Sequence, residues 1–334
     1  MTREVPVREA SAKTKVSMQT QEHFYSKLLL FGEYSILFGS SALSIPYSQF
    51  QAELSFIRDD KYTALDKAEQ SNSMMKDFLA WLGNDWPEAG DHLDLARFRY
   101  DLSEGLYLES TIPQGYGLGS SGALCAAVYH RYTLHKQGIS IPSPAMISAL
   151  RIIFAKMESF FHGQSSGIDP LAIYLKSPLH VKPDGNPEIV GIPRNWNDKP
   201  SGIFLIDTGY SGKTSSFVPD YLKLFVPDGK RSVTGEQLLN LNNHAIESLL
   251  RAEMPAFWET LSELSAFQFR HMQSVIPRSM DDCWQQGLDS GDYCLKICGS
   301  GGGGFLTGFA PDYNKARIRL KSSGIRTIPV FLAG

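Results

Sequence analysis

The chain has 334 residues, of which 43% are hydrophobic and 20% charged, a balance typical of a globular protein with one large domain or two domains. The formal net charge of −3 gives no indication of a basic surface that would bind nucleic acid. The four cysteines are scattered, which indicates neither a disulfide framework nor a structural zinc site. No apolar run reaches the length of a membrane span. We therefore expect a protein of a reducing cytoplasm that binds neither nucleic acid nor membrane.

Apolar runs, glycine-rich breaks and amphipathic stretches alternate along the chain, which predicts an α+β protein with two layers in each domain. A stretch rich in Pro, Asn and Gly (183–200) is the candidate link, and we predict one domain over 21–195 and another over 196–334. In chain order, the predicted elements are a flexible tail (1–20), two strands joined by a tight connection (25–47), a strand (98–113), a helix (123–136), a helix (144–162), two strands (170–181 and 201–212), a helical region (235–270), a strand followed by a glycine loop and more buried chain (296–309), and a last strand (326–333).

The helix predicted over 144–162 has the clearest boundaries and contains an unusual carboxylate. Ser143 is a suitable N-cap, Pro144 suits the first helical position, and the helix should end before Gly163. Glu158 falls on the apolar side of this helix, one turn from Phe154. A carboxylate there must be paired or bind a cation, unless it reaches solvent or accepts a hydrogen bond from a serine.

The segment PQGYGLGSSGAL (113–124) places a glycine-rich loop between a predicted strand and a predicted helix. The free N–H groups at a helix N-terminus, together with the positive end of its dipole, bind anions, and glycines let the backbone approach phosphate oxygens. The sequence therefore predicts a phosphate-binding loop here.

Other loops of similar appearance fit less well. Residues 117–122 match GxGxxG, but no acidic residue follows within the next thirty or so positions, where a dinucleotide site needs one. A P-loop needs a Gly-Lys-Ser/Thr ending, and protein kinases need a DFG triplet; the chain has neither. Residues 163–167 match the GxSxG of hydrolases, but a helix is predicted before them and a strand after them, which is the reverse of the nucleophile elbow.

Three separated segments together resemble the GHMP kinases, the superfamily of galactokinase, homoserine kinase, mevalonate kinase and phosphomevalonate kinase. They are an N-terminal lysine followed by FGEYSILFGSSAL (31–43), the glycine loop PQGYGLGSSGAL, and KICGSGGGGF (296–305), in the order the family has them. The resemblance covers about residues 23–310. It implies a ribosomal-protein-S5-like, ATP-binding N-terminal domain, a ferredoxin-like C-terminal GHMP kinase domain, and an active site between them.

Within the superfamily, MESFFHGQSSGIDPLA (157–172) is most similar to mevalonate kinase, because eleven positions separate Glu158 from Asp169. The resemblance implies ATP and Mg²⁺ as cofactors, and it allows a homodimer. Asp169 would be the general base or would orient the substrate hydroxyl, with its backbone held extended by Pro170. Lys27 would stand near Asp169 and neutralise charge on the transferred group.

The remaining site residues follow from the same resemblance. The phosphate contacts would come from Gly115, Gly117, Leu118, Gly119, Ser120, Ser121 and Gly122. The magnesium ligands would be Ser121 and Glu158. The substrate contacts would come from Glu33, Tyr34, Thr214, Gly301 and Gly302.

The acceptor implied by these segments is mevalonate, which would be converted to 5-phosphomevalonate for isoprenoid precursors. Phosphomevalonate kinase, a sugar kinase and a non-catalytic kinase-fold sensor remain alternatives. Tyr34 stands where mevalonate kinases usually have histidine and is closer to the phosphomevalonate kinases. Against this, the segments assigned to the acceptor offer only Lys27 and Lys213, which is few cations for a second phosphate group.

Overall fold

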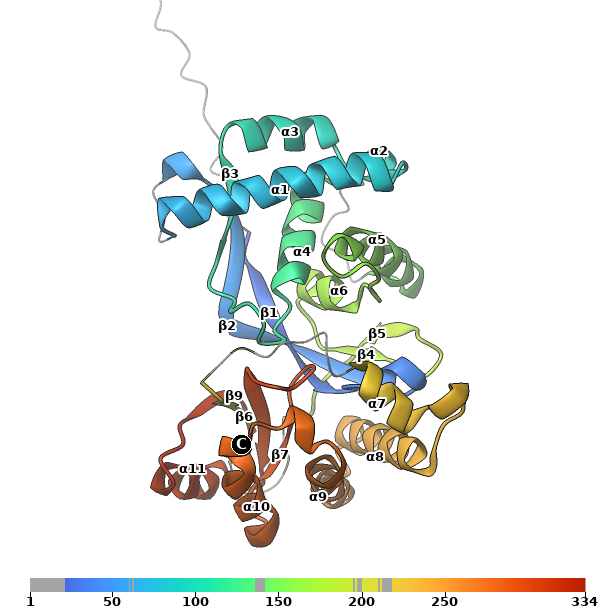
Figure 1. The fold of residues 1–334 in the computed structure, drawn as a ribbon, viewed down its shortest axis with the longest axis vertical. Coiled ribbons are helices and arrows are strands. Elements are labelled where there is room, and N and C mark those ends of the chain that lie inside the picture. The colour runs from blue at the N-terminus through green and yellow to red at the C-terminus, as the bar shows by residue number, and fades with distance from the viewer. Residues whose placement is uncertain are drawn as a thin grey trace, which may run out of the picture.

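The computed structural model describes residues 22–59, 61, 63–135, 142–194, 196, 200–209, 211 and 218–333. It contains two antiparallel β-sheets, which lie one above the other along the long axis of the molecule, with helices packed around each (Figure 1). The predicted tail (1–20) lies outside the described residues.

The upper sheet is organised around one long strand. This strand, β2, pairs with three neighbours, because its first residues pair with β4 and its last ones with β3, while β1 runs along its other edge. The strands are β1 (Phe24–Phe31), β2 (Ala42–Phe56), β3 (Leu106–Ser110), β4 (Leu179–Val181) and β5 (Pro187–Ile189). A 3-10 turn, η1 (Ser35–Phe38), connects β1 to β2.

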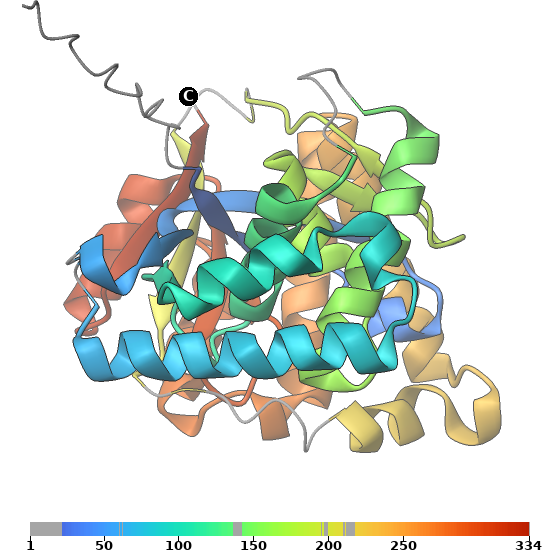
Figure 2. The same ribbon diagram turned by 90° about the horizontal axis from the view of Figure 1, so that it is seen from above.

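Helices cover this sheet, and an apolar cluster is buried between these helices and the strands. Figure 2 shows α1 and α3 side by side across the top of the molecule. The helices of this part are α1 (Leu65–Asp85), α2 (Ala89–His92), α3 (Leu95–Ser103), α4 (Ser120–Tyr132), α5 (Pro144–His162) and α6 (Ile168–Leu175).

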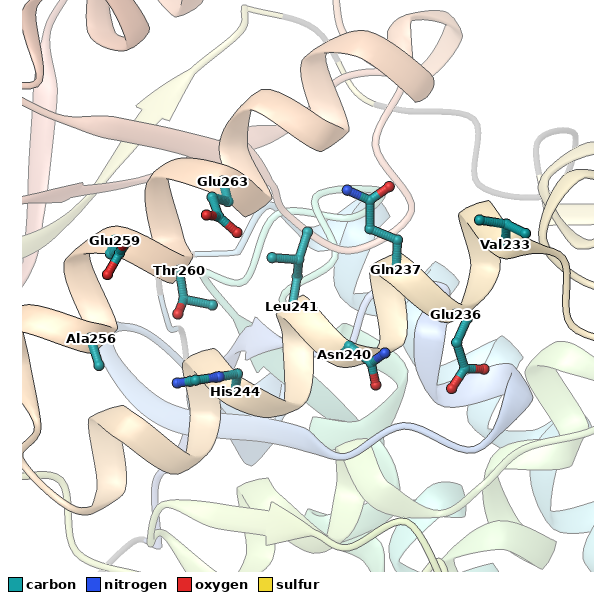
Figure 3. Close-up of a pocket in the computed structure, with 10 residues that line it drawn as sticks. All are labelled: Val233, Glu236, Gln237, Asn240, Leu241, His244, Ala256, Glu259, Thr260 and Glu263. Carbon is teal, nitrogen blue, oxygen red and sulfur yellow. The ribbon is translucent and has the colours of Figure 1, made fainter.

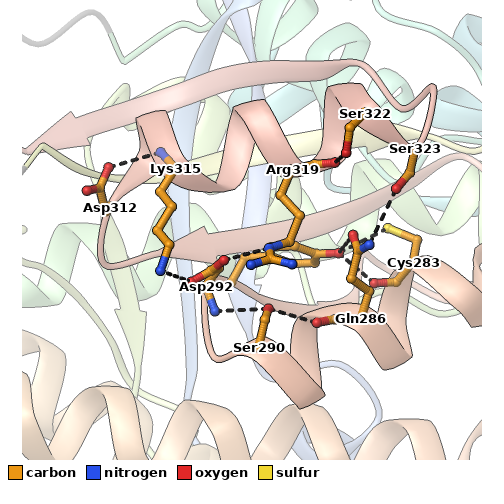
Figure 4. Close-up of polar contacts among 10 residues, drawn as sticks. Cys283, Gln286, Ser290, Asp292, Asp312, Lys315, Arg319, Ser322 and Ser323 are labelled. Atoms are coloured by element: carbon orange, nitrogen blue, oxygen red, sulfur yellow. Dashed lines mark hydrogen bonds and ion pairs between the residues drawn. The ribbon is translucent and has the colours of Figure 1, made fainter.

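The lower sheet has four strands in the order β7-β8-β6-β9, all antiparallel. They are β6 (Ser201–Asp207), β7 (Cys294–Ile297), β8 (Phe305–Ala310) and β9 (Thr327–Ala333). The accompanying helices are α7 (Val218–Phe225), α8 (Val233–Leu250), α9 (Met254–His271), α10 (Asp281–Ser290) and α11 (Tyr313–Ser322). Asp292, just before β7, accepts hydrogen bonds from Lys315 and Arg319 and so joins α11 to the sheet (Figure 4).

The two sheets share one continuous apolar core. The ring of Phe31, at the end of β1, lies 5.6 Å from Phe309 of β8 and 6.2 Å from Phe257 of α9. Beside this contact, the Asn242 side chain donates to the Ser41 carbonyl at 2.8 Å. Because aromatic burial and buried hydrogen bonds join the two parts, the loops that meet between them are held in fixed positions.

Most predicted elements are present, and the start of α5 has the predicted cap, with the Ser143 hydroxyl accepting from the Met146 N–H. The strand prediction over 170–181 is wrong in its first half, because residues 168–175 form α6 and only Leu179–Val181 is strand. Residues 98–103, also predicted as strand, belong to α3. The predicted link contains β5, and the predicted domain boundary at 195/196 falls between β5 and β6.

Candidate active site

The predicted phosphate loop leads directly into α4, whose N-cap is Gly119 in the left-handed conformation (φ 79°). No side chain caps this helix end, so its first N–H groups are available for an anion. The Leu118 carbonyl accepts a hydrogen bond from the Lys27 N–H at 3.2 Å, which ties the loop to β1. A β-carbon on Gly122 would stand 2.9 Å from the Pro170 nitrogen, so the N-terminal ends of α4 and α6 meet at this point.

A second glycine loop (299–304), between β7 and β8, packs against the phosphate loop. A β-carbon on Gly117 would lie 3.4 Å from the Gly299 Cα, and one on Gly304 would lie 3.1 Å from the Tyr116 Cα. The two loops therefore touch backbone to backbone, although about 180 positions of sequence separate them. The predicted contacts Gly301 and Gly302 lie against Val275, whose carbonyl accepts from the Gly302 N–H at 2.7 Å.

Lys27 and Asp169 form an ion pair where α4 and α6 meet. The Lys27 Nζ lies 2.9 Å from the Asp169 Oδ2; Lys27 is 4% exposed, whereas the Asp169 side chain is 39% exposed. Burial alone would lower the pKa of Lys27, but the Asp169 carboxylate outweighs it, and the pKa lies above its ordinary value. The pair thus combines a buried, fixed cation with a carboxylate that a substrate can reach.

The surroundings of Asp169 correct one sequence-based expectation. Asp169 lies in the first turn of α6, so Pro170 does not hold it in an extended strand. A proline is tolerated in the first turn because the N–H it lacks has no partner within the helix. The GxSxG segment lies between α5 and α6, so the nucleophile elbow lacks its preceding strand here as well.

Glu158 is buried (4% exposed) and is held by two serine hydroxyls, Ser121 at 3.2 Å and Ser165. Burial and the neighbouring Asp169 carboxylate raise the pKa of Glu158 to about 7. The Ser121 hydroxyl also lies 3.2 Å from the His162 Nε2. The sequence identified Glu158 and Ser121, but it did not identify Ser165 as a partner.

These groups suit a magnesium ion whose remaining ligands are phosphate oxygens. A buried carboxylate whose charged form is disfavoured gains from a neighbouring cation, and a hydroxyl and a carboxylate are hard oxygen donors. Within the described ranges, no group of three or more His, Cys, Asp or Glu side chains could hold a metal by itself. Mg²⁺ is commonly held by one or two carboxylates together with substrate phosphates, so Glu158 and Ser121 suit that kind of site.

A cavity of about 740 Å³ opens beside the start of α4. It is bounded by α1, β3 and the end of α5, and the serines of the phosphate loop form one side of it. Its lining comprises Thr63, Lys67, Gln70, Ser71, Met74, Leu108, Ser110, Ile112, Gln114, Ser120, Ser121, Leu124, Phe161 and His162. The α1 side of this cavity was not predicted, because apolar walls and scattered polar groups leave no readable motif.

Glu33 and Tyr34, which were predicted to contact the substrate, make polar contacts with other residues of the protein. The Glu33 Oε1 lies 2.5 Å from the Nζ of Lys296, and both side chains are buried. The Tyr34 hydroxyl donates to the Ser300 carbonyl at 2.5 Å. The sequence analysis did not identify Lys296. The predicted contact Thr214 lies outside the described residues.

A further groove of about 730 Å³ lies between α8 and α9 (Figure 3). Its lining carries Glu236, Glu259 and Glu263, whose negative charge opposes binding of a phosphate anion. The candidate active site is therefore the region around the two glycine loops.

Two glycine loops, an uncapped helix end and a Lys–Asp pair are the parts that phosphoryl-transfer proteins use to hold and neutralise phosphates. Residues 92–177 match the family model described as the GHMP kinases N terminal domain. Residues 92–177 are thus similar to the N-terminal domain of the GHMP kinases, and the chain has the GHMP kinase fold, as the sequence motifs predicted. Members of this family are small-molecule kinases. A search of curated protein sequences found no match.

Solved structures with this fold act on different acceptors. L. major mevalonate kinase in complex with R-mevalonate has 16% identity and a TM-score of 0.59, over 94% of this chain and 96% of that one. Streptococcus pneumoniae phosphomevalonate kinase has 16% identity and a TM-score of 0.56, over 92% and 97%. Lactococcus lactis galactokinase complexed with galactose has 16% identity and a TM-score of 0.62, over 95% and 94%.

Within the described ranges, no helix is both long and apolar enough to cross a membrane.

Proposed function

We propose that this protein is an ATP-dependent kinase that phosphorylates the hydroxyl of mevalonate to give 5-phosphomevalonate. The observation that carries the proposal is the Lys27–Asp169 pair, 2.9 Å apart, where the N-terminal ends of α4 and α6 meet. A carboxylate within reach of a substrate, next to a fixed cation and a phosphate loop, suits transfer of a phosphoryl group to an alcohol.

The nucleotide would bind along the first glycine loop. The β- and γ-phosphates would accept hydrogen bonds from the backbone N–H groups of residues 115–122, aided by the dipole of α4. The nucleoside would occupy the cavity bounded by α1 and β3, which adjoins Ser120 and Ser121. Glu158 and Ser121 would hold Mg²⁺, which neutralises phosphate charge when it is bound.

Asp169 would accept a hydrogen bond from the acceptor hydroxyl and receive its proton as the phosphorus–oxygen bond forms. Lys27, fixed by burial, would offset the negative charge that builds up on the transferred group. Most of the rate enhancement would come from placing the hydroxyl in line with the γ-phosphorus, because phosphoryl transfer depends chiefly on positioning and charge neutralisation.

Among the described residues, which do not include Lys213, the distribution of cations supports mevalonate over phosphomevalonate as the acceptor. Lys27 is already paired with Asp169, and Lys296 is paired with Glu33. Arg58 lies at the end of β2 next to α3, where it pairs with Glu104 at 3.6 Å. A second phosphate on the acceptor would need additional cations near Asp169. Tyr34 in the first motif favours phosphomevalonate, which is therefore the second candidate.

A panel assay tests the proposal. ADP release is measured with Mg·ATP and mevalonate, phosphomevalonate, galactose or homoserine at equal concentrations, and the rate without acceptor is subtracted. We expect mevalonate to give the highest kcat/KM. A higher value with phosphomevalonate would show that the cation argument is wrong and that Tyr34 was the better guide. Nucleotide binding without ADP release from any acceptor would support the non-catalytic sensor instead.

A further inference from the structure

We infer that Tyr34 and Glu33 do not recognise the acceptor, and that they position the second glycine loop (299–304) against the phosphate loop so that the nucleotide site keeps its shape. This inference rests on the proposed function for its kinetic consequences. It assigns a positioning role to two residues of the first motif and adds Lys296 to the residues that maintain the site.

The second glycine loop needs partners outside itself to stay in one place. Ser300 is its one non-glycine residue, and the five glycines around it, 299 and 301–304, all have positive φ values. Glycine-rich backbone loses more conformational freedom on ordering than any other kind, and such a loop offers no side chains to pack. On one side, the Val275 carbonyl accepts from the Gly302 N–H at 2.7 Å.

The first motif holds the loop from the other side. The Tyr34 hydroxyl donates to the Ser300 carbonyl at 2.5 Å, and its ring stands edge-on to Tyr221 at 5.1 Å. Tyr34 is buried, and burial raises the pKa of its phenol, which therefore stays protonated and able to donate. Its only hydroxyl hydrogen is used in this bond, so the phenol cannot also donate a hydrogen bond to the substrate.

The backbone of Tyr34 has an unusual conformation that its surroundings must maintain. Its φ of 62° is unusual for a residue with a side chain, and such strain persists only where the surroundings enforce it. The Ser35 N–H donates to the Glu33 carbonyl at 2.7 Å, and the Leu37 N–H donates to the Tyr34 carbonyl at 3.0 Å. These bonds fix the turn in the conformation that directs the phenol at the loop.

Glu33 anchors the strand that enters the same loop. The Lys296 Nζ lies 2.5 Å from the Glu33 Oε1 and also donates to the Ile297 carbonyl at 2.9 Å. Lys296 is in β7, three residues before the Gly299 that touches Gly117. The Glu33 and Tyr34 contacts therefore determine together how close the second loop lies to the phosphate loop.

The Tyr34→Phe variant tests this, because it removes the hydroxyl and keeps the ring. We expect the Kd of a non-hydrolysable ATP analogue, measured by calorimetry, and the KM for ATP to rise about three- to tenfold, as for one lost hydrogen bond. The KM for mevalonate should change less than twofold. Amide hydrogen exchange in 299–304, measured without ligand, should become faster, because the bond to the Ser300 carbonyl, one of several hydrogen bonds that hold the loop, is gone.

Tyr293→Phe is the matched control. The Tyr293 phenol is also buried and donates to a backbone carbonyl, that of Cys283, at 2.7 Å, but it contacts neither glycine loop. We expect Tyr293→Phe to lower the melting temperature about as much as Tyr34→Phe does, without changing the nucleotide Kd or the exchange of 299–304. This comparison separates positioning from a general loss of stability.

Three results would overturn the inference. A raised mevalonate KM with an unchanged nucleotide Kd in Tyr34→Phe would return Tyr34 to the acceptor site. A Kd and exchange rates equal to the wild-type values would show that the hydroxyl does not position the loop, while leaving the kinase function intact. A wild-type protein that binds no nucleotide analogue would overturn the proposed function and this inference with it.

Discussion

Gly119→Ala is expected to disturb catalysis by displacing Lys27. A β-carbon on Gly119 would lie 3.2 Å from the Lys27 Cγ, 3.3 Å from its Cε and 3.0 Å from the Ile173 Cδ1, all shorter than ordinary van der Waals separations. The lysine stem must shift, and the Nζ–Oδ2 distance of 2.9 Å to Asp169 shifts with it. A displacement of about 1 Å in such a site costs about a hundredfold, and these contacts require a shift of only a few tenths of an ångström, so we expect kcat to fall about three- to tenfold.

Gly119→Ala also introduces backbone strain, which a second variant controls. Gly119 has φ 79° and Gly291, at the end of α10, has φ 65°, but a β-carbon on Gly291 would meet nothing within 4 Å. Each substitution should cost about 1–2 kcal/mol of unfolding free energy, read as a lower melting temperature. Steady-state kinetics should show the kcat loss in Gly119→Ala only. Equal kcat values in the two variants would refute the reasoning about Lys27.

Three further substitutions test other parts of the account. Asp169→Asn should lower kcat about 10²- to 10⁴-fold and leave the Kd of an ATP analogue within about twofold, whereas near-wild-type turnover would remove Asp169 as the base. Glu158→Gln should raise the Mg²⁺ concentration needed for half-maximal rate without lowering the melting temperature, because burial disfavours the carboxylate; an unchanged Mg²⁺ midpoint with a lower melting temperature would favour a purely structural role. Asp292→Asn should lower the free energy of unfolding by about 1–2 kcal/mol at pH 7, a range that allows for the solvent exposure of Lys315 and Arg319. Burial tends to raise the pKa of Asp292, but the hydrogen bonds from Lys315 and Arg319 outweigh it and hold the pKa below its ordinary value. The stabilisation is therefore present at neutral pH and lost as the pH falls through the pKa of the folded state, so the two proteins should converge in urea denaturation below about pH 4; a constant difference down to pH 2 would contradict the ion-pair explanation.

The fold could be predicted where local sequence determines local structure. The cap of α5 at Ser143 and the glycine loop before α4 depend on short-range patterns, and both are present. The segment that forms α6 was predicted as strand because a short, continuous apolar run is compatible with either structure. Its residues Ile168, Leu171 and Ile173 are all buried, so burial on several sides removed the periodicity that distinguishes the two.

The candidate site was predictable in its motifs and in the one long-range pair that the resemblance implied, and not in its other long-range contacts. The pairing of Lys27 with Asp169 was expected from the family resemblance, and the two side chains are in contact. The pairing of Glu33 with Lys296 joins residues 263 positions apart, and no local pattern encodes it. The same holds for Tyr34, which the resemblance assigned to the substrate: its hydroxyl donates to the Ser300 carbonyl, a partner that has no signature in the sequence.

The central claim is that the γ-phosphoryl group of ATP is transferred to a hydroxyl of mevalonate, and ³¹P NMR of a reaction with Mg·ATP and mevalonate tests it most directly. The account predicts that the γ-phosphate resonance declines while the resonances of ADP and a new phosphomonoester grow in equal amounts. ATP that remains intact, or inorganic phosphate that accumulates in place of the phosphomonoester, would contradict it.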